Sequence, residues 1–219
     1  MWGGVEGGFH ESQSRFVENI IGRSRAYWQH AYPAVQAAFA VFQDVSLEQF
    51  YQGINKVQPG WQRITADEVS YSLHVILRFE LERDWFAGKI STEDLPAAWS
   101  DKSFKYLGLR PQDDVQGVLQ DMHWAGDYIG YFQSYALGNI YDGQILAALK
   151  QDLPQWAEFL AAGNFAPVTD WLRQKIWRWG CSLTGADLLQ GITGSRRLDA
   201  RLFLQYLQHK YGQLYQLEE

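Results

Sequence analysis

The sequence predicts an all-α protein, a mostly antiparallel assembly of many helices. Apolar residues recur every three or four positions through long stretches, such as residues 16–28, and this is the period of one buried helical face. Residues typical of helix starts precede several of these stretches, and glycine or proline follows them. No alternating pattern longer than four residues predicts a strand. Because the composition shows no break, we expect a single α-helical domain over residues 1–219.

The first two helices are predicted from apolar spacing and from one proline. Glycines at positions 3, 4, 7 and 8 make a flexible lead-in to a helix over residues 10–30. Pro33 lacks a backbone N–H and clashes with the preceding turn, so we expect a break near Tyr32. A second helix is then predicted over residues 34–45.

Two capping boxes predict the next helix starts. Ser46 and Gln49 begin a third helix, and Pro59 with the following glycine closes that segment. Thr65 is the expected N-cap of a long helix to about residue 85, with Glu68 reaching back to it.

A polar line runs along this long helix beside its apolar stripe. Asp67, Tyr71, His74 and Arg78 follow at steps of four, three and four residues, so they share one helical face. Such a line is usually solvated, but it could equally line a groove, and the residues leave both open. We interpret His74 and Arg78 as structural and Asp67 as a support of the helix start.

The second half of the chain is predicted to continue as helices separated by glycine and proline. In order, we expect a helix from Ser91 or Thr92 to about Gly108, a loop or interrupted helix over 116–130, a long helix over 131–151, shorter helices over 154–162, 168–179 and 184–190, and a last helix capped by Asp199 and ending at Tyr215.

Charge and cysteine usage exclude several classes of protein. The net charge is −6 and no block of Lys or Arg occurs, so we expect no nucleic-acid partner. No apolar run reaches the length of a membrane span, so we expect no membrane partner. One cysteine, Cys181, cannot form an internal disulfide, and the first residues do not resemble a signal peptide. We therefore expect a cytoplasmic protein.

The residues His10 and Glu11 begin the first helix. From spacing alone, Glu11 is a carboxylate that the helix dipole stabilises in a first turn, and a metal ligand is the less favoured alternative. None of the five histidines stands in a His-x-x-x-His pair. His10 and Glu11 point about 100° apart on a helix, so they cannot easily bind one ion together. We therefore expect this chain alone to bind a metal ion weakly or not at all.

Several motifs, in order along the chain, resemble one family. The run from His10 to Arg15, with Glu18-Asn19 and Gly22 to Arg25 after it, resembles a signature of the thermostable carboxypeptidase (carboxypeptidase Taq) family of zinc metallopeptidases. Residues 117–124 match that family's Gly-x-x-Gln-Asp-x-His-Trp motif, and residues 63–69 are similar to its Ile-Arg-x-x-Ala-Asp motif, except that Gln62 replaces isoleucine. Residues 130–139 are similar to its next segment, except that Gln133 replaces proline. The family's N-terminal half, which carries its His-Glu-x-x-His helix, is not in this sequence.

The resemblance implies a fold like the C-terminal half of a zincin-type carboxypeptidase, and it implies roles for particular residues. Glu11 would be the third zinc ligand, and His10 would at most support a ligand by a hydrogen bond. His123 and Tyr131 would donate hydrogen bonds to the oxyanion that forms on the peptide carbonyl, and Arg63 would bind the terminal carboxylate of the substrate. Each residue also has a simpler interpretation. His123 could be a half-buried hydrogen-bonding histidine, Tyr131 an aromatic between helices, and Arg63 a surface ion-pair partner.

Two functions are therefore open. The first is a zinc-dependent metallocarboxypeptidase that removes C-terminal amino acids from peptides, inactive unless the missing half completes it. The alternative is a non-catalytic α-helical assembly or binding domain derived from such an enzyme. We also expect a homo-oligomer, because the side of the first helix with Phe16, Ile20 and Trp28 would lose its cover without that half.

Overall fold

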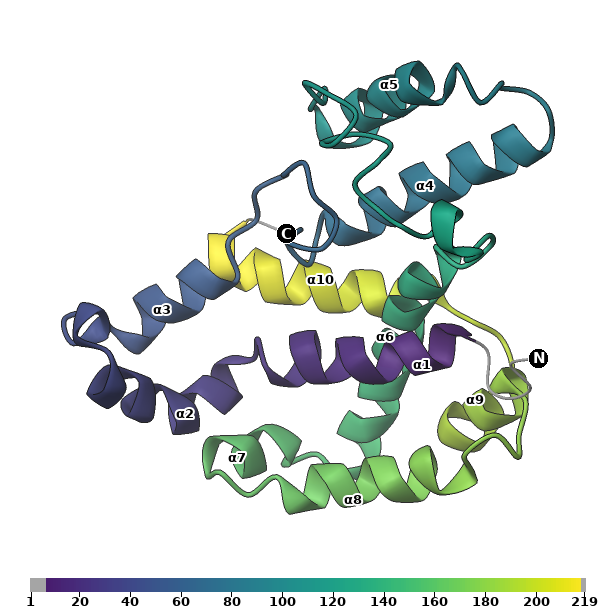
Figure 1. Cartoon of the computed structure of the whole chain (residues 1–219). Helices are drawn as coiled ribbons and strands as arrows, with labels where there is room; N and C mark the ends of the chain where they lie inside the picture. The colour runs from purple at the N-terminus through teal and green to yellow at the C-terminus, as the bar shows by residue number, and fades with distance from the viewer. Residues whose placement is uncertain (1–6, 218–219) are drawn as a thin grey trace. The chain divides into compact units, whose positions relative to one another are not determined.

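The computed structural model describes residues 7–217, and every regular element in this range is a helix. The all-α prediction is therefore confirmed. The α-helices, shown in Figure 1, are α1 (Gly7–Arg15), α2 (Arg25–Ala38), α3 (Leu47–Ile54), α4 (Tyr71–Phe86), α5 (Leu95–Leu107), α6 (Gln133–Asp152), α7 (Trp156–Ala161), α8 (Ala166–Lys175), α9 (Gly185–Thr193) and α10 (Ala200–Tyr215). The chain divides into two compact units, of which unit 2 is Lys56–Ala136 and unit 1 is the remainder. The single domain over residues 1–219 that the sequence predicts stays a prediction.

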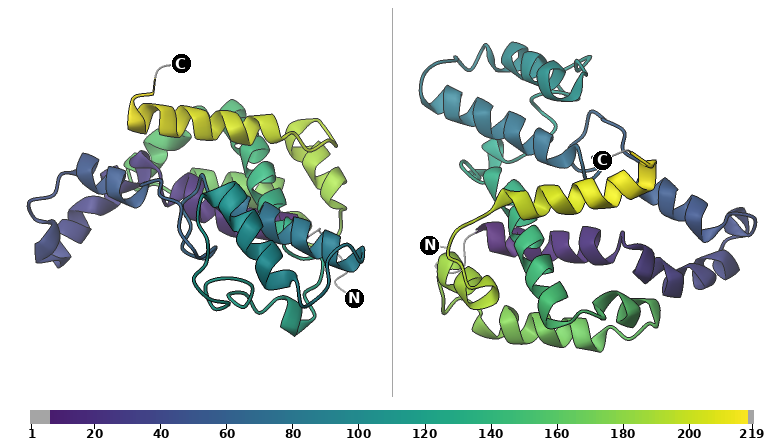
Figure 2. Two further views of the ribbon diagram at one scale, coloured as in Figure 1. Left: turned by 90° about the horizontal axis from the view of Figure 1, so that it is seen from above. Right: turned by 180° about the vertical axis from the view of Figure 1, so that it is seen from behind.

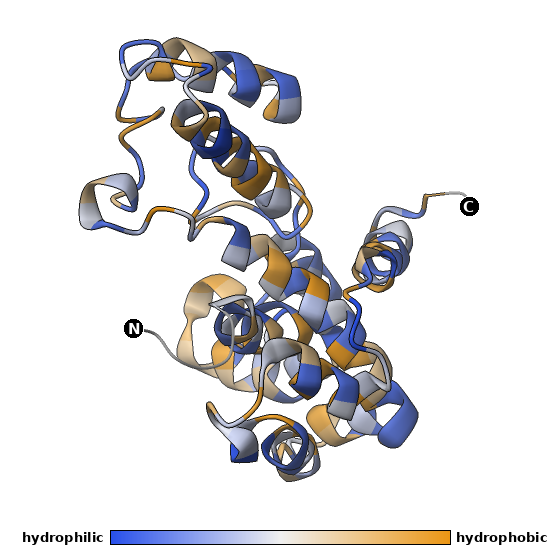
Figure 3. Cartoon of the chain, turned by 90° about the vertical axis from the view of Figure 1, so that its right-hand side faces the viewer, coloured by the Kyte–Doolittle hydropathy of each residue, from blue (hydrophilic) through white to orange (hydrophobic). Residues whose placement is uncertain are grey.

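The core of unit 1 is made by α1, α6, α8 and α9, with the π-helical turn Phe16–Ile21 that follows α1. Figure 3 shows that helices of the chain carry both hydrophobic and hydrophilic residues. The side chains that meet in this core include Phe9, Phe16, Ile20, Tyr141, Ile145, Leu149, Leu172, Leu188 and Leu189. Burying each large apolar side chain contributes roughly 1.5–3 kcal/mol.

The predicted helix over residues 10–30 is wrong in one respect, because the chain leaves the helix after residue 21. Ser24 is the N-cap of α2, and its hydroxyl accepts a hydrogen bond from the backbone N–H of Tyr27. A serine cap satisfies a donor that would otherwise be unpaired, so it stabilises a new start here. The glycines expected as a lead-in divide: Gly7 and Gly8 lie inside α1, and positions 3 and 4 lie outside the described residues.

The predicted break at Pro33 is also wrong, because α2 continues through this residue to Ala38. The helix is held by its packing in a hairpin with α3 (Figure 2). The rings of Trp28 and Tyr32 each lie 4.6 Å from that of Phe50 on α3. The Tyr32 hydroxyl donates a hydrogen bond of 2.7 Å to the carbonyl of Val45. These contacts outweigh the backbone hydrogen bond that proline removes.

One capping box is confirmed and the other is wrong. Ser46 and Gln49 bond reciprocally at the start of α3, as predicted. Thr65 does not cap α4, which begins only at Tyr71. Instead the Asp67 carboxylate accepts the backbone N–H groups of Val69 and Ser70, at 2.9 Å and 2.8 Å. The aspartate therefore stabilises a turn before the helix rather than its first turn.

The later elements follow the predictions closely. Gly108 ends α5 with a φ of +72°, Thr184 and Asp199 cap α9 and α10, and α6 fills the predicted long helix. The predicted start at Ser91 or Thr92 is wrong, because α5 begins only at Leu95, after Asp94. Helix α8 also differs, since it ends at Lys175 and gives way to a short 3₁₀ turn. Among the described residues, no helix is both long and apolar enough to cross a bilayer.

Unit 2 consists of the segment 56–70, α4, α5, the loop between α5 and α6, and the first turn of α6. Helices α4 and α5 pack side by side through Leu77, Leu81 and Trp99 (Figure 1). A second cluster gathers Tyr71 and Val75 of α4 against Phe132, and Trp124 of the loop contacts both clusters. This loop therefore packs on α4 through aromatic side chains.

The apolar side expected to drive oligomerisation is not exposed in unit 1. Phe16 and Ile20 have exposed fractions of 1% and 3%, because α6, α8 and α9 cover them. Trp28 is half-buried against Phe50 and donates a hydrogen bond to the carbonyl of Gly22. The reason given for an oligomer is therefore wrong, and the oligomer itself stays a prediction.

Candidate functional site

Arg63 lies in the segment before α4 and is held by an acid from the loop after α5. Its Nε and Nη2 both donate to one carboxylate oxygen of Asp121, at 3.2 Å and 2.7 Å. Its Nη1 donates to the hydroxyl of Tyr71 at 3.0 Å. Burial lowers the pKa of Arg63, but the hydrogen bond and the charge of Asp121 outweigh burial and raise it. The simpler interpretation of Arg63 as a surface ion-pair partner is therefore wrong, because the pair is buried.

A second arginine, Arg78, binds the other oxygen of the same carboxylate. Arg78 is fully buried on α4, and its Nε donates to the other oxygen of Asp121 at 2.6 Å. Its Nη2 donates to the side chain of Gln120 at 2.7 Å. Burial lowers the pKa of Arg78 to about 10, against the opposing effect of Asp121. The polar line of α4 is therefore a buried network rather than a solvated face.

This network carries one net positive charge. Two guanidinium groups, those of Arg63 and Arg78, share one carboxylate, that of Asp121. Within ion-pair distance of either arginine, the described residues supply no other acid. His74, which is also buried, adds no charge at neutral pH, because burial and the nearby arginines lower its pKa to about 4. Among the described residues, one of the two guanidinium charges thus has no acid of its own within ion-pair distance.

His123 is half-buried beside this network. Its Nε2 lies 2.9 Å from the hydroxyl of Tyr135, and its Nδ1 lies 3.8 Å from a carboxylate oxygen of Asp121. Burial, and then the charge of Arg63, lower the pKa of His123. The imidazole is therefore neutral at pH 7, with one nitrogen able to donate and the other to accept a hydrogen bond.

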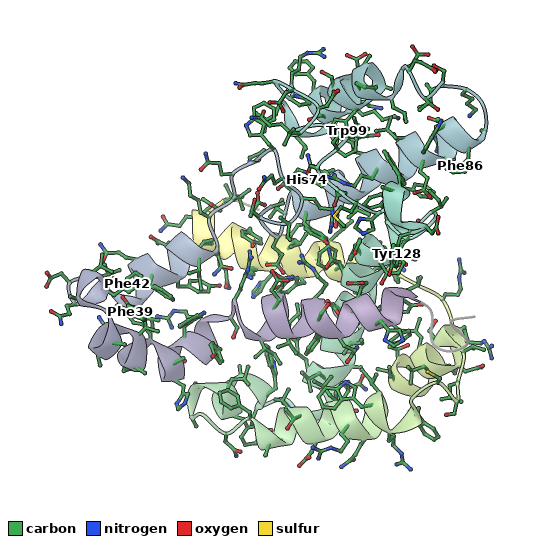
Figure 4. All side chains as sticks on the ribbon, viewed as in Figure 1. Phe39, Phe42, His74, Phe86, Trp99 and Tyr128 are labelled. Carbon is green, nitrogen blue, oxygen red and sulfur yellow. The ribbon has the colours of Figure 1, made fainter. Side chains whose placement is uncertain are left out.

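Tyr131 stacks on His123 at the start of α6. The two ring centroids lie 6.2 Å apart with the planes tilted by 29°. Tyr135 lies one helical turn further along, and the guanidinium carbon of Arg63 stacks over its ring, 4.5 Å from the ring centroid. The exposed ring of Tyr128, which is labelled in Figure 4, lies near both His123 and Tyr131. A cation, a neutral imidazole and a phenol thus meet in unit 2.

Arg63 keeps two N–H groups for a ligand. A guanidinium has five N–H donors, and Asp121 and Tyr71 take three of them. The remaining two belong to different terminal nitrogens, which suits a carboxylate that binds with both oxygens. Arg63 is itself fixed by its neighbours, so binding such a ligand requires little further ordering.

Glu11 and His10 belong to unit 1 and lie on α1. His10 is exposed and Glu11 is half-buried. Helix α6 fixes this helix where the two cross (Figures 1 and 2). The buried hydroxyl of Ser12 donates to Asp142 at 2.7 Å, and Arg15 donates to Asn139 at 3.3 Å. The neighbours of Glu11 thus hold its backbone against α6.

The crossing is close because α6 has a glycine there. A Cβ atom at Gly138 would lie 2.9 Å from the backbone nitrogen of Ser12 and 3.0 Å from the carbonyl carbon of Glu11. A Cβ atom at Gly8, one helical turn before Ser12, would lie 2.9 Å from the Cβ atom of Leu137. Only glycine allows two backbones to approach this closely.

The described residues do not by themselves form a zinc site. In residues 7–217, no group of three or more His, Cys, Asp or Glu side chains is placed to hold a metal ion. Glu11 is a suitable donor, but a catalytic zinc takes three protein ligands. A metal at Glu11 would therefore need ligands from outside this part of the chain.

The structure brings three of the predicted residues together in unit 2, namely Arg63, His123 and Tyr131. Sequence reasoning gave no role to Asp121 or Gln120, although both lie inside the motif of residues 117–124. The signal that could have found their partners was the polar line on α4, because charged residues at helical spacing beside an apolar stripe need counterparts if they are buried.

Comparisons with known proteins agree with these motifs. The family model of the carboxypeptidase Taq (M32) metallopeptidases matches residues 1–211. Carboxypeptidase 1 of Bacillus subtilis is 43% identical over 215 residues, which are 98% of this chain and 43% of that protein. Thermostable carboxypeptidase 1 of Thermus thermophilus is 43% identical over 219 residues, with the same two coverages.

Solved structures give the same result. The M32 carboxypeptidase from Deinococcus radiodurans matches with a TM-score of 0.94 at 41% identity, over 98% of this chain and 44% of that one. The carboxypeptidase of Pyrococcus furiosus matches with a TM-score of 0.91 at 40% identity, over 95% and 42%. The chain thus spans about 43% of the length of the relatives it matches. It belongs to the carboxypeptidase Taq (M32) family of metallopeptidases, of which it covers a C-terminal portion.

Proposed function

We propose that this chain supplies one metal ligand and part of the substrate site of a zinc-dependent carboxypeptidase that removes C-terminal amino acids from peptides. The observation that carries the proposal is the buried cluster of Arg63, Asp121 and Arg78, with its one unbalanced positive charge. The C-terminus of a peptide offers a single carboxylate, whose two oxygens suit the two remaining N–H groups of Arg63.

The neighbours of Arg63 suit the next part of the reaction. When water attacks the terminal peptide bond, the carbonyl oxygen gains negative charge and needs hydrogen-bond donors. His123 is neutral at pH 7, so it donates without competing with Arg63 for the carboxylate. The Tyr131 phenol is the second donor. Both rings are only part-exposed, which strengthens such bonds by keeping out water.

Glu11 is the proposed zinc ligand, with His10 at most supporting it. In such sites the bound zinc lowers the pKa of a water molecule towards neutrality. The other two ligands belong, on this proposal, to the part of the family fold that this chain does not span. The chain alone should therefore retain no stoichiometric zinc after dialysis and release no C-terminal residues.

A chimera tests the proposal. The N-terminal part of the Bacillus subtilis carboxypeptidase 1 that the match leaves out would precede this chain. We expect it to release C-terminal amino acids from a peptide, and Tyr131→Phe to lower kcat by about a hundred- to a thousandfold while zinc is retained. Tyr128→Phe is the matched control, because it removes a hydroxyl from an exposed ring of the same loop. Equal turnover in Tyr131→Phe and the control would exclude Tyr131 from the mechanism.

A second candidate is a non-catalytic α-helical assembly or binding domain. It is favoured by the network of Arg63, Asp121 and Arg78, because buried ion pairs of this kind could also serve only to hold the fold together. A folded chimera that holds zinc but cleaves nothing would support it.

The proposed cytoplasmic location is supported by the single cysteine. The proposed homo-oligomer is tested by sedimentation of the purified chain, where a monomer at high concentration would exclude it.

A further inference from the structure

Glu82 binds both ends of the loop that separates His123 from Tyr131. This glutamate is buried on α4, with an exposed fraction of 7%. One carboxylate oxygen accepts the indole N–H of Trp124 at 2.8 Å, and the other accepts the backbone N–H of Gly130 at 2.5 Å. Trp124 directly follows His123, and Gly130 directly precedes Tyr131. We call Glu82, Trp124 and Gly130 the carboxylate clamp.

Between the two ends, the segment is anchored mainly at His123, whose carbonyl accepts the backbone N–H groups of Gly126 and Tyr128 at 3.1 Å and 3.0 Å. Residues 125–130 are all exposed, and the ring of Tyr128 contacts those of His123 and Tyr131. Asp127 and Gly130 both adopt the left-handed region, with φ of +61° and +76°. Such a turn reverses the chain sharply, so a small shift at either end would move His123 relative to Tyr131.

The chemistry of the clamp needs a carboxylate. Both donors are N–H groups, and each uses a different oxygen of Glu82. A glutamine offers only one oxygen, and its amide nitrogen would face a second donor. In the described part of the chain, no Lys, Arg or His pairs with Glu82, so this buried acid is not there to balance a charge. Burying a carboxylate without a cation is unfavourable, and its two hydrogen bonds are what offset this.

We infer that Glu82 is a positioning residue for His123 and Tyr131, and that it fixes the distance between the two proposed oxyanion donors. This inference rests on the proposed function. Glu82 does not touch the substrate in this account. It acts through Trp124 and Gly130. Helix α4 thus supports both donors through Glu82, and it supports Arg63 through Tyr71 and, by way of Asp121, through Arg78.

Glu80 provides a matched control on the same helix. It also accepts two hydrogen bonds, from Lys102 at 2.7 Å and from the Tyr106 hydroxyl at 2.8 Å, but both partners lie on α5. Glu80→Gln therefore makes the same chemical change on α4 without touching the loop. Trp124→Phe is a second test variant, because it removes one clamp bond and keeps an aromatic ring.

The first measurement is amide hydrogen exchange on the full 219-residue chain. Glu82→Gln should speed exchange at Gly130 by about tenfold, since the one remaining oxygen is neutral and cannot serve both donors in the wild-type geometry, which weakens the hydrogen bond of Gly130. Glu80→Gln should leave the exchange rate at Gly130 unchanged.

The second measurement is the steady-state kinetics of the chimera, where Glu82→Gln should lower kcat by about ten- to a hundredfold and change KM less than about twofold. Trp124→Phe should lower kcat and leave exchange at Gly130 nearly unchanged.

The outcomes separate the two proposals. Unchanged exchange at Gly130 in Glu82→Gln would overturn the clamp even if the chimera is active. Faster exchange with unchanged kcat would overturn the positioning role. If Glu82→Gln does not fold, an unchanged kcat in Trp124→Phe would overturn it instead. An inactive wild-type chimera would contradict the proposed function, and the exchange measurement would still decide whether Glu82 holds the loop.

Discussion

Arg63 gives two hydrogen bonds to the same oxygen of Asp121, and this single acid also neutralises the fully buried Arg78. The position of the proposed substrate-binding arginine therefore depends on an ion pair in the interior of unit 2. Burial raises the pKa of Asp121, but Arg78 and Arg63 outweigh burial and lower it below its usual range.

Replacing Asp121 by Asn should destabilise the chain by about 3–5 kcal/mol, because Arg78 would remain buried without its acid. The measurement is the free energy of unfolding from urea denaturation at pH 7. Asp101→Asn is the control, because Asp101 makes an exposed pair with Arg110 and its loss should leave stability unchanged. A loss below about 1 kcal/mol in Asp121→Asn would show that the pair contributes no more than a surface one.

Stability should fall as the pH falls from about 6.5 to about 4, in part because of His74. The pKa of His74 is about 4 in the folded chain and near 6.5 when unfolded, so the unfolded state binds the proton first. The contribution of His74 to the free energy of unfolding is therefore fully present above pH 6.5. It is lost as the pH falls towards 4, by up to roughly 3 kcal/mol. Asp121 contributes a separate loss at lower pH, since its pKa is lowered and its pairing is lost only on protonation.

Unfolding measurements at pH 7 and pH 4.5 test this dependence. His74→Gln cannot titrate, so its stability should change less between the two values than that of the wild type. His209→Gln, on the exposed face of α10, should keep the wild-type dependence. Parallel profiles for the wild type and His74→Gln would contradict the prediction.

Gly138→Ala should destabilise the chain by about 1–3 kcal/mol, because the added Cβ atom overlaps the α1 backbone at Ser12 and Glu11. Gly53→Ala should have the opposite sign. Gly53 lies within α3 with nothing inside 4 Å of the added atom, so alanine should stabilise by roughly 0.5–1 kcal/mol. Thermal denaturation of both variants measures the pair. Equal shifts of Tm would mean that the crossing of α1 and α6 is not tight.

Much of the fold could be predicted where the signal is local. The Ser46 and Gln49 capping box, the Asp199 cap and the glycine at the end of α5 depend on neighbours within four residues, and all are confirmed. The continuation of α2 through Pro33 could not be predicted in this way. It depends on the rings of α3, which no local rule on proline takes into account.

The site shows the same division. Resemblance brought Arg63, His123 and Tyr131 forward as candidates, and the structure places them in one unit. The groups that hold them lie far away in sequence: Asp121 is 58 residues from Arg63, and Glu82 is 42 residues from Trp124. Sequence periodicity shows that a residue faces the interior, but it does not show which partner it meets there. The burial of Phe16 by α6 and α8 was missed for the same reason.

The zinc content of the chimera tests the central claim most directly, namely that this chain contributes Glu11 to the metal site. The wild type should keep about one zinc per chain after dialysis, and Glu11→Gln should keep none, because an amide oxygen is a far weaker ligand than a carboxylate. Glu18→Gln, two helical turns along and paired with Arg15 and Arg23, should keep the wild-type content. Zinc retained by Glu11→Gln at the wild-type stoichiometry would contradict the account.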